Sequence, residues 1–278
     1  MKVRILGARG SLPSTNPETS HFGGNTSCIE VTEQDQLLII DAGTGILQLS
    51  PKKIAPVGRY DILLTHLHID HIQGLGFFKP LFNPKNNVHI WGPSSSSKSL
   101  YSRLNKYLSP PLFPVHFKNL PCKMHLHEIS HSSFRIGNLS IKSNYISHPG
   151  PTVGYRISNG TSVFTYLPDH EPFIGNRGSD FGERWISGID LASQADLLIH
   201  DSQYTYKEYE TKVGWGHSTF ESAVKFGTLA EVKKILLFHH DPHHTDKRLE
   251  KIYKKFMDGK KFDYKIKLAV EGAVYKLK

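Results

Sequence analysis

The chain has 278 residues, of which 38% are hydrophobic, and its formal net charge is +9. This composition supports a sizeable core, and no segment approaches the roughly 20 consecutive apolar residues that a membrane-spanning helix requires. The positive charge favours anionic partners such as nucleotides or RNA, although lysines near the C-terminus would give the same charge as a solvated face.

Cys28 and Cys122 are the only cysteines and lie far apart, so the sequence contains no disulfide framework. The N-terminal segment lacks the long apolar stretch and the small-residue cleavage site of a signal peptide. Both observations favour a cytoplasmic protein with two ordinary buried thiols and no membrane attachment.

Strand-like segments recur along the chain; most are short, rich in leucine or β-branched residues, and flanked by turn-forming residues. They are predicted at residues 2–6, 28–32, 36–40, 61–65, 88–91, 139–146, 153–157, 162–166, 197–200, 234–238 and 265–276. Helices are predicted at residues 74–81, 97–107, 205–211, 219–230 and 247–256. This pattern predicts a layered α/β protein with large mixed sheets. Because no repeat or linker stands out, we expect a single domain over residues 1–278, with an insertion at about 77–131.

The motif His66-Leu67-His68-Ile69-Asp70-His71 directly follows the apolar strand predicted at residues 61–65. Imidazole nitrogens and carboxylate oxygens are ligands of Zn²⁺ and neighbouring divalent metals. His66 and His68 alternate along an extended segment and point to one side, whereas Asp70 and His71 begin the next turn. One loop can therefore serve two adjacent metals. Four ligand-type residues in six positions argue against a polar loop with incidental histidines.

This motif resembles the His-x-His-x-Asp-His signature of the metallo-β-lactamase superfamily, and further segments follow in the family's order. The turn at Asp41 resembles the one that supports the metal loop, and residues 153–157 resemble the Val-Gly-Tyr-Arg strand of the RNase Z-like branch. The resemblance implies a four-layer αββα sandwich, in which two mixed β-sheets are flanked by helices.

The resemblance also implies a site for two divalent metal ions. One metal would be held by His66, His68 and His148, and the other by Asp70, His71 and His239, with Asp169 bridging the two. Zn²⁺ is the expected metal, and Mn²⁺ or Fe²⁺ are alternatives because the same ligands accept them. Whether His170 and His240, which adjoin two of these ligands, support the site from behind stays open.

Two more segments resemble the RNase Z-like phosphodiesterases. Gly216-His217-Ser218-Thr219 resembles their Gly-His-Ser-Thr motif, and Asp201 ends the strand whose acid orients the histidine. A histidine held by a carboxylate can bind a phosphate oxygen and protonate a leaving alkoxide. We therefore expect Asp70, His217 and Asp201 in catalysis, and Arg9, Ser218 and Thr219 in substrate binding. The alternatives are a helix cap for His217, a buried strand-end acid for Asp201 and structural packing for the loop of Arg9.

RNase Z enzymes that trim tRNA carry a long arm between their third and fourth motifs, but His148 and Asp169 are too close for such an arm. The resemblance thus favours a dinuclear metal-dependent phosphodiesterase for a small anionic nucleotide-type substrate, with 3′,5′-cyclic nucleotides leading. A hydroxide generated by the metals would attack phosphorus. The alternatives are an RNA 3′-processing endonuclease and a non-catalytic metal- or nucleotide-binding protein of the same fold.

We expect residues 77–131 to form a substrate-shaping cap or the contact of a homodimer. Four aromatic side chains in this segment are candidates for stacking on a base, although core packing is the default role for aromatic residues. They are Tyr101, Tyr107, Phe113 and Phe117.

Overall fold

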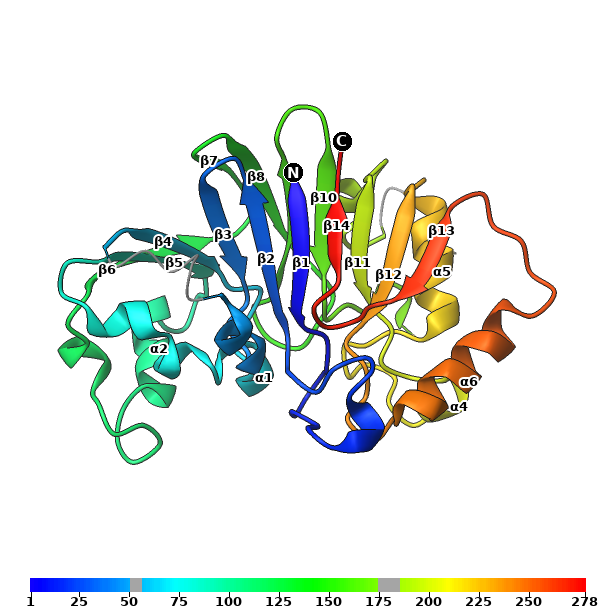
Figure 1. Ribbon diagram of the computed structural model, residues 1–278, viewed down its shortest axis with the longest axis horizontal. Helices are drawn as coiled ribbons and strands as arrows, with labels where there is room; N and C mark the ends of the chain where they lie inside the picture. Colours follow the sequence, from blue (N-terminus) through cyan, green and yellow to red (C-terminus); the bar gives the residue numbers. More distant parts are fainter. Residues whose placement is uncertain (51–56, 175–185) are drawn as a thin grey trace.

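The computed structural model describes residues 1–50, 57–174 and 186–278. Within these ranges the strands assemble into two seven-stranded sheets that pack face to face (Figure 1). The first sheet has the order β14 (Val274–Lys276), β1 (Lys2–Gly7), β2 (Cys28–Glu33), β3 (Gln36–Ile40), β4 (Arg59–Leu63), β5 (Asn87–Pro93) and β6 (Lys123–Ile129). The second has the order β13 (Lys265–Leu268), β12 (Lys234–Phe238), β11 (Leu197–Asp201), β10 (Val163–Leu167), β9 (Val153–Ser158), β8 (Leu139–Tyr145) and β7 (Ser132–Ile136).

Both sheets are mixed. Strands β14, β1, β2 and β3 pair antiparallel, and β3 to β6 pair parallel. In the second sheet, β7 to β10 pair antiparallel, and β10 to β13 pair parallel. The central parallel strands read as nearly continuous apolar runs because helices cover one face and the other sheet covers the opposite face.

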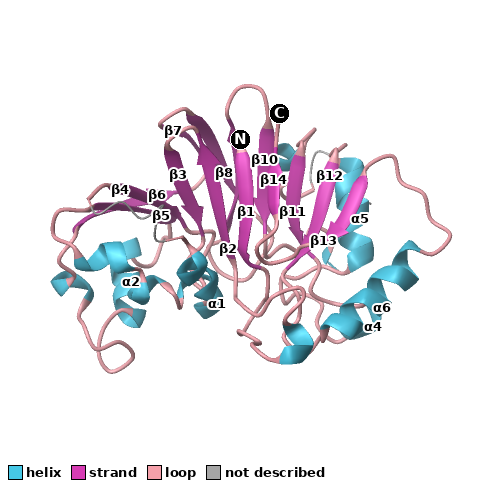
Figure 2. Cartoon of the chain, in the orientation of Figure 1, coloured by secondary structure: helices cyan, strands magenta, loops and turns pink. Residues whose placement is uncertain are grey.

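Helices lie on the two outer faces, and the strands lie between them (Figure 2). The described helices are α1 (Ile69–Ile72), α2 (Leu100–Tyr107), α3 (Ile189–Ala192), α4 (Tyr206–Tyr209), α5 (Phe220–Leu229) and α6 (Asp246–Met257). Short 3₁₀ helices are found at Pro17–Thr19, Thr44–Gln48, Leu75–Phe77, Lys79–Phe82 and Phe117–Asn119.

Three apolar clusters hold these layers together. One fills the space between the sheets, and the others pack the first sheet against α2 and the second sheet against α3, α5 and α6. This arrangement confirms the predicted four-layer sandwich of two mixed sheets flanked by helices. No helix in the described ranges has the length and apolar character needed to cross a bilayer.

Several predicted elements differ from the observed ones. The helix expected at residues 74–81 is instead two 3₁₀ turns, and the strand expected at 265–276 is divided into β13 and β14. Strands β6 and β7 were not predicted. Residues 77–131, predicted as an insertion, contain β5 and β6 of the first sheet and α2 between them.

The fold brings several strand ends to one edge. Strands β3 and β4 are parallel neighbours, as are β10, β11 and β12, so their carboxyl ends lie at a common edge. Ligand sites in α/β proteins usually lie beyond the carboxyl ends of such strands.

Candidate metal centre and active site

Seven ligand-type side chains meet at this edge and form two groups that share Asp169. The first group is His66, His68, His148 and Asp169, and the second is Asp70, His71, Asp169 and His239. Within each group the candidate ligand atoms lie within 4.8 Å of one another. The structure therefore brings together all seven side chains that we assigned to the two metals.

Asp169 lies between the groups at the end of β10. Its Oδ1 is 3.0 Å from His71 Nε2 and 3.4 Å from His239 Nε2. Its Oδ2 is 3.6 Å from His66 Nε2 and 3.8 Å from His148 Nε2. One carboxylate oxygen thus faces each group, as a bridging ligand requires.

The donor atoms fit divalent cations. His66 Nε2, His71 Nε2 and Asp169 Oδ1 are buried and have no hydrogen-bond partner of suitable geometry among the described residues, whereas buried polar groups are normally satisfied. Burial lowers the pKa of His148 to about 4, so its imidazole is neutral and has a free lone pair at neutral pH. Imidazole and carboxylate together are the donor set expected for Zn²⁺, Mn²⁺ or Fe²⁺.

The two carboxylates of the second group, Asp70 and Asp169, are held in the ionised form, because nearby histidines lower both pKa values. Burial alone would raise the pKa of Asp169, but His239, His71 and His66 lower it well below its usual value. Burial would also lower the pKa of His239, but Asp169 and the other nearby acids raise it to about 9. The raised pKa of His239 reflects the carboxylate charge gathered at the centre, which a bound divalent cation would neutralise in place of the proton.

The rings of His71 and His148 are oriented from behind by hydrogen bonds that their Nδ1 atoms donate, which leaves Nε2 for a metal. His71 Nδ1 donates to Asp41 Oδ2 at 2.8 Å, and Asp41 in turn accepts from the amide and hydroxyl of Thr65. His148 Nδ1 donates to the Gly216 carbonyl at 2.9 Å. The turn at Asp41 therefore supports the metal loop, in agreement with the role that the resemblance implied.

His239 is oriented by a residue that the sequence reasoning missed. Its Nδ1 donates to Gln203 Oε1 at 3.1 Å, and Gln203 Nε2 donates to Ser11 Oγ. The amide of Ser11 donates to Asp70 Oδ2 at 2.8 Å. A Cβ atom at Gly10 would lie 2.3 Å from His239 Nδ1, so a glycine is needed where this loop passes the ligand. The position of Gln203 two residues after Asp201 is the only sequence signal that could have indicated it.

His217 lies beside the second group and is paired with an acid. Its Nδ1 is 2.6 Å from Asp201 Oδ2, and its ring stacks on that of His239 with a centroid distance of 4.9 Å. Asp201 also accepts hydrogen bonds from the amides of Gln203 and Ser218. Because Nδ1 is engaged, Nε2 is the nitrogen of His217 left for a substrate.

Arg9 does not have the position that we predicted. Its guanidinium is fully buried and donates to the carbonyls of Gly23, Asp241 and His244, with Asp246 Oδ1 at 3.5 Å. It ties the N-terminal loop to the segment after β12. The predicted contact between Arg9 and the substrate is therefore wrong, and Arg9 has the structural role that was the alternative.

Replacing Arg9 with methionine should lower the free energy of unfolding by about 3 kcal/mol, because three buried carbonyls lose a charged donor. Urea denaturation measures this loss, with exposed Arg135→Met on β7 as the matched control. Unchanged stability together with a raised KM would restore Arg9 as a substrate-binding residue.

The hydroxyl groups of Ser218 and Thr219 also make hydrogen bonds within the protein. Both are buried; Ser218 Oγ donates to the His170 carbonyl, and Thr219 Oγ1 caps α5 by accepting from the Ser222 amide. Thus the structure gives these two residues local structural roles instead of the predicted contact with substrate. The helix-cap alternative raised for His217 belongs to Thr219.

His170 and His240, left open by the sequence, point elsewhere. His170 Nδ1 lies 3.0 Å from His200 Nε2, and its Nε2 lies near Ser187. His240 Nε2 donates to the Ala269 carbonyl at 2.8 Å. Neither belongs to the two ligand groups, and neither is hydrogen-bonded to a ligand side chain within the described residues.

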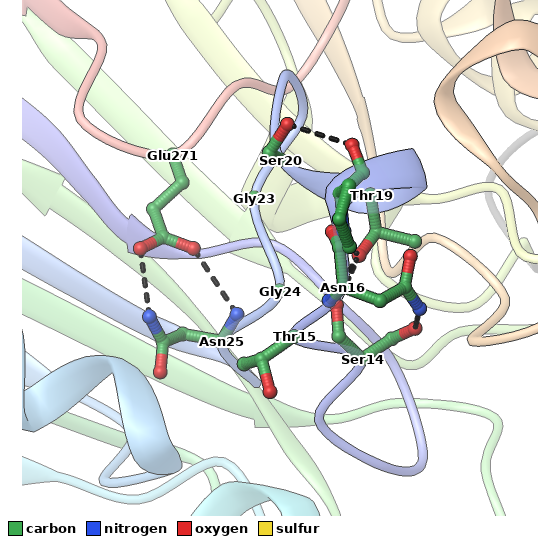
Figure 3. Close-up of a pocket in the computed structure, with 10 residues that line it drawn as sticks. Ser14, Thr15, Asn16, Thr19, Ser20, Gly23, Gly24, Asn25 and Glu271 are labelled. Carbon is green, nitrogen blue, oxygen red and sulfur yellow. Dashed lines mark hydrogen bonds between the residues drawn. The ribbon is translucent and has the colours of Figure 1, made fainter.

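A separate polar hollow of about 470 Å³ lies beside the N-terminal loop (Figure 3). Its one carboxylate, Glu271, accepts hydrogen bonds from the amide and side-chain nitrogens of Asn25. None of the ligand-type residues above lines it. Its acid is therefore already used to hold the loop, and the chemistry lies at the metal centre.

Comparisons with known proteins agree with this site. Residues 37–240 match the model of the β-lactamase superfamily domain. A curated Ribonuclease Z from Prochlorococcus marinus is 25% identical over the whole of both chains. The metallo-β-lactamase fold protein YhfI from Bacillus subtilis has a TM-score of 0.68 at 20% identity, covering 99% of this chain and 98% of that one. The short form of human tRNase Z has a TM-score of 0.63 at 19% identity, covering 99% of each.

The chain therefore belongs to the family of β-lactamase superfamily domains. The comparisons confirm the predicted membership in the metallo-β-lactamase superfamily and its RNase Z-like branch, and with it the prediction of a metal-dependent hydrolase. The alignment with the Prochlorococcus protein spans 323 positions, so that relative has segments that this 278-residue chain lacks.

Proposed function

We propose that this protein is a dinuclear metal-dependent phosphodiesterase that hydrolyses a nucleotide-type phosphodiester. The observation that carries the proposal is the 2.6 Å pair of His217 and Asp201 beside the two ligand groups. The metal ligands alone serve many hydrolyses, because a fold and its metal site do not specify a substrate. A carboxylate-held histidine next to the metals adds what phosphodiester cleavage needs, a proton donor for an alkoxide.

Divalent cations held by the two groups would supply positive charge to the phosphate oxygens and make a water molecule a stronger nucleophile. The protein's own residues position the rest. Asp201 holds Nδ1 of His217, so that Nε2 can carry a proton toward the leaving oxygen. Hydrolysis then adds a hydroxyl to phosphorus, breaks the P–O bond and leaves the proton on the departing alcohol. Zn²⁺ is the expected metal, and Mn²⁺ or Fe²⁺ would fit the same donors.

Two substrate classes follow from different observations. The short connection between His148 and Asp169, which leaves no room for a long RNA-binding arm, favours a small substrate such as a 3′,5′-cyclic nucleotide. The curated relatives named Ribonuclease Z favour RNA 3′-end cleavage. Both reactions need the same hydrolytic centre.

The test is turnover of a substrate panel by the Zn²⁺- or Mn²⁺-loaded protein. We expect hydrolysis of bis-p-nitrophenyl phosphate and of at least one nucleotide diester among cyclic AMP, cyclic GMP, dinucleotides and a tRNA precursor. A β-lactam should remain intact. Cleavage of the β-lactam alone, or of no diester with either metal, would contradict the proposal.

A further inference from the structure

A pocket of about 360 Å³ opens directly beside the first ligand group. His66 and His68 form one of its borders, and side chains of the metal loop such as Leu67 and Ile69 continue its wall. Its volume is within the usual range for small-molecule sites. Substrate bound at the metals can therefore extend into this pocket.

The opposite wall is one face of α2. Arg103, Lys106 and Tyr107 are spaced three and four residues apart, so they share that face, whereas Leu100 and Leu104 pack into the core. Of the four aromatic candidates, Tyr107 alone lines this pocket; Phe113 and Phe117 are buried in the core.

Tyr107 is fixed in place. Its hydroxyl donates to the Gln73 carbonyl at 2.6 Å, which holds the ring against the wall. Leu112, Ile72 and Pro149 add apolar surface to the lining, and Leu112 is 70% exposed. A fixed ring and an exposed apolar surface suit a nucleoside, which has an apolar face.

Arg103 has an unused donor in this setting. One of its terminal nitrogens donates to the Pro93 carbonyl, but Nε is buried and has no hydrogen-bond partner in the described part of the chain. Burial lowers the pKa of Arg103, although Glu128 and Tyr145 act in the opposite direction. Lys106 is exposed and forms no ion pair with the described residues, and no acid is among those that line the pocket. Two cations with no acid among the described lining residues match a bound anion.

We propose that this pocket binds a second phosphate group of the substrate at Arg103 and Lys106, with the intervening nucleoside on Tyr107 and the apolar wall. The inference rests on the proposed phosphodiesterase function. The preferred substrates are then nucleotide diesters with at least two phosphates, such as a 5′-phosphorylated dinucleotide or a polynucleotide end. A 3′,5′-cyclic mononucleotide has only one phosphate and leaves Arg103 and Lys106 without an anion.

The test compares a dinucleoside monophosphate, ApA, with its 5′-phosphorylated form, pApA. The metal-loaded protein should hydrolyse pApA with a kcat/KM roughly 10- to 100-fold higher, mainly through KM, as expected for one or two charge-assisted hydrogen bonds. Lys106→Ala and Arg103→Lys should reduce this preference about tenfold or more, with a much larger loss on pApA than on ApA. Lys142→Ala, an exposed lysine on β8, is the charge-matched control and should keep the preference.

A second measurement separates this inference from the proposed function. Adenosine 3′,5′-bisphosphate should inhibit hydrolysis of bis-p-nitrophenyl phosphate at least about tenfold more strongly than AMP, and Lys106→Ala should remove the difference. Equal inhibition by both, with intact hydrolysis, would overturn the second-phosphate site and leave the phosphodiesterase function standing. If no diester is hydrolysed at all, calorimetric binding of the bisphosphate against AMP still decides the pocket.

Discussion

Replacing Asp169 with alanine should abolish metal-dependent turnover, with a loss on the order of 10³-fold or more. Partners that only orient a ligand from behind typically contribute about 10- to 100-fold to affinity or activity. Asp169 faces both ligand groups, with Oδ1 3.0 Å from His71 and Oδ2 3.6 Å from His66. Its removal should therefore weaken both metal sites together. The measurement is the metal content per chain, alongside hydrolysis of bis-p-nitrophenyl phosphate.

The matched control is Asp35→Ala, which removes an exposed carboxylate from the turn between β2 and β3. It should keep two metals per chain and full activity. His66→Ala should affect the first group more than the second, because His66 belongs to only one of them. An Asp169→Ala protein that keeps both metals and its turnover would exclude the bridging role.

The fold was predictable to the extent that each strand carries its own local pattern. Strands such as β3 and β12 are short apolar runs between turn residues, and their observed bounds match the predicted ones. Strand β6 has the alternation of a half-buried strand, with Met124 and Leu126 turned to the first sheet's helix side, but its four polar positions concealed this pattern.

Other differences depend on contacts that local patterns do not contain. The chain after β13 turns at Gly272, with a φ of 84°, and joins the other sheet as β14. The predicted helix at 74–81 contains Gly76, where a Cβ would lie 2.6 Å from Phe113, and Pro80, which removes a helical donor. Close packing at Gly76 and the low helix propensity of glycine and proline together favour 3₁₀ turns in this segment.

The candidate site was predictable where a ligand-type residue directly follows an apolar strand, as His66, Asp169 and His239 do. The supporting residues were harder to predict because their roles depend on neighbours remote in sequence. Arg9 is a residue type that often contacts phosphate, yet its guanidinium donates to carbonyls more than 200 positions away in the sequence. Gln203 has no motif of its own, and only the fold places it behind His239.

Replacing His217 with alanine should impair cleavage according to the leaving group. For a dinucleotide, whose leaving alkoxide needs a proton, turnover should fall about 10²- to 10⁴-fold, the usual contribution of general acid–base catalysis. For bis-p-nitrophenyl phosphate, whose nitrophenolate departs without a proton, the loss should be less than about tenfold by the same reasoning. The measurement is kcat for both substrates with metal-loaded protein.

Metal content separates this role from coordination, because Asp201, His217 and His239 also form a group whose ligand-type atoms lie within 4.8 Å of one another. A proton donor can be removed with both metals retained, whereas a ligand cannot. Asp201→Asn should show the same leaving-group dependence in weaker form, about 10- to 100-fold on the dinucleotide, because Asp201 only positions the imidazole. Equal losses on both substrates, or metal loss in His217→Ala, would show that His217 holds a metal and that the leaving alkoxide takes its proton from elsewhere.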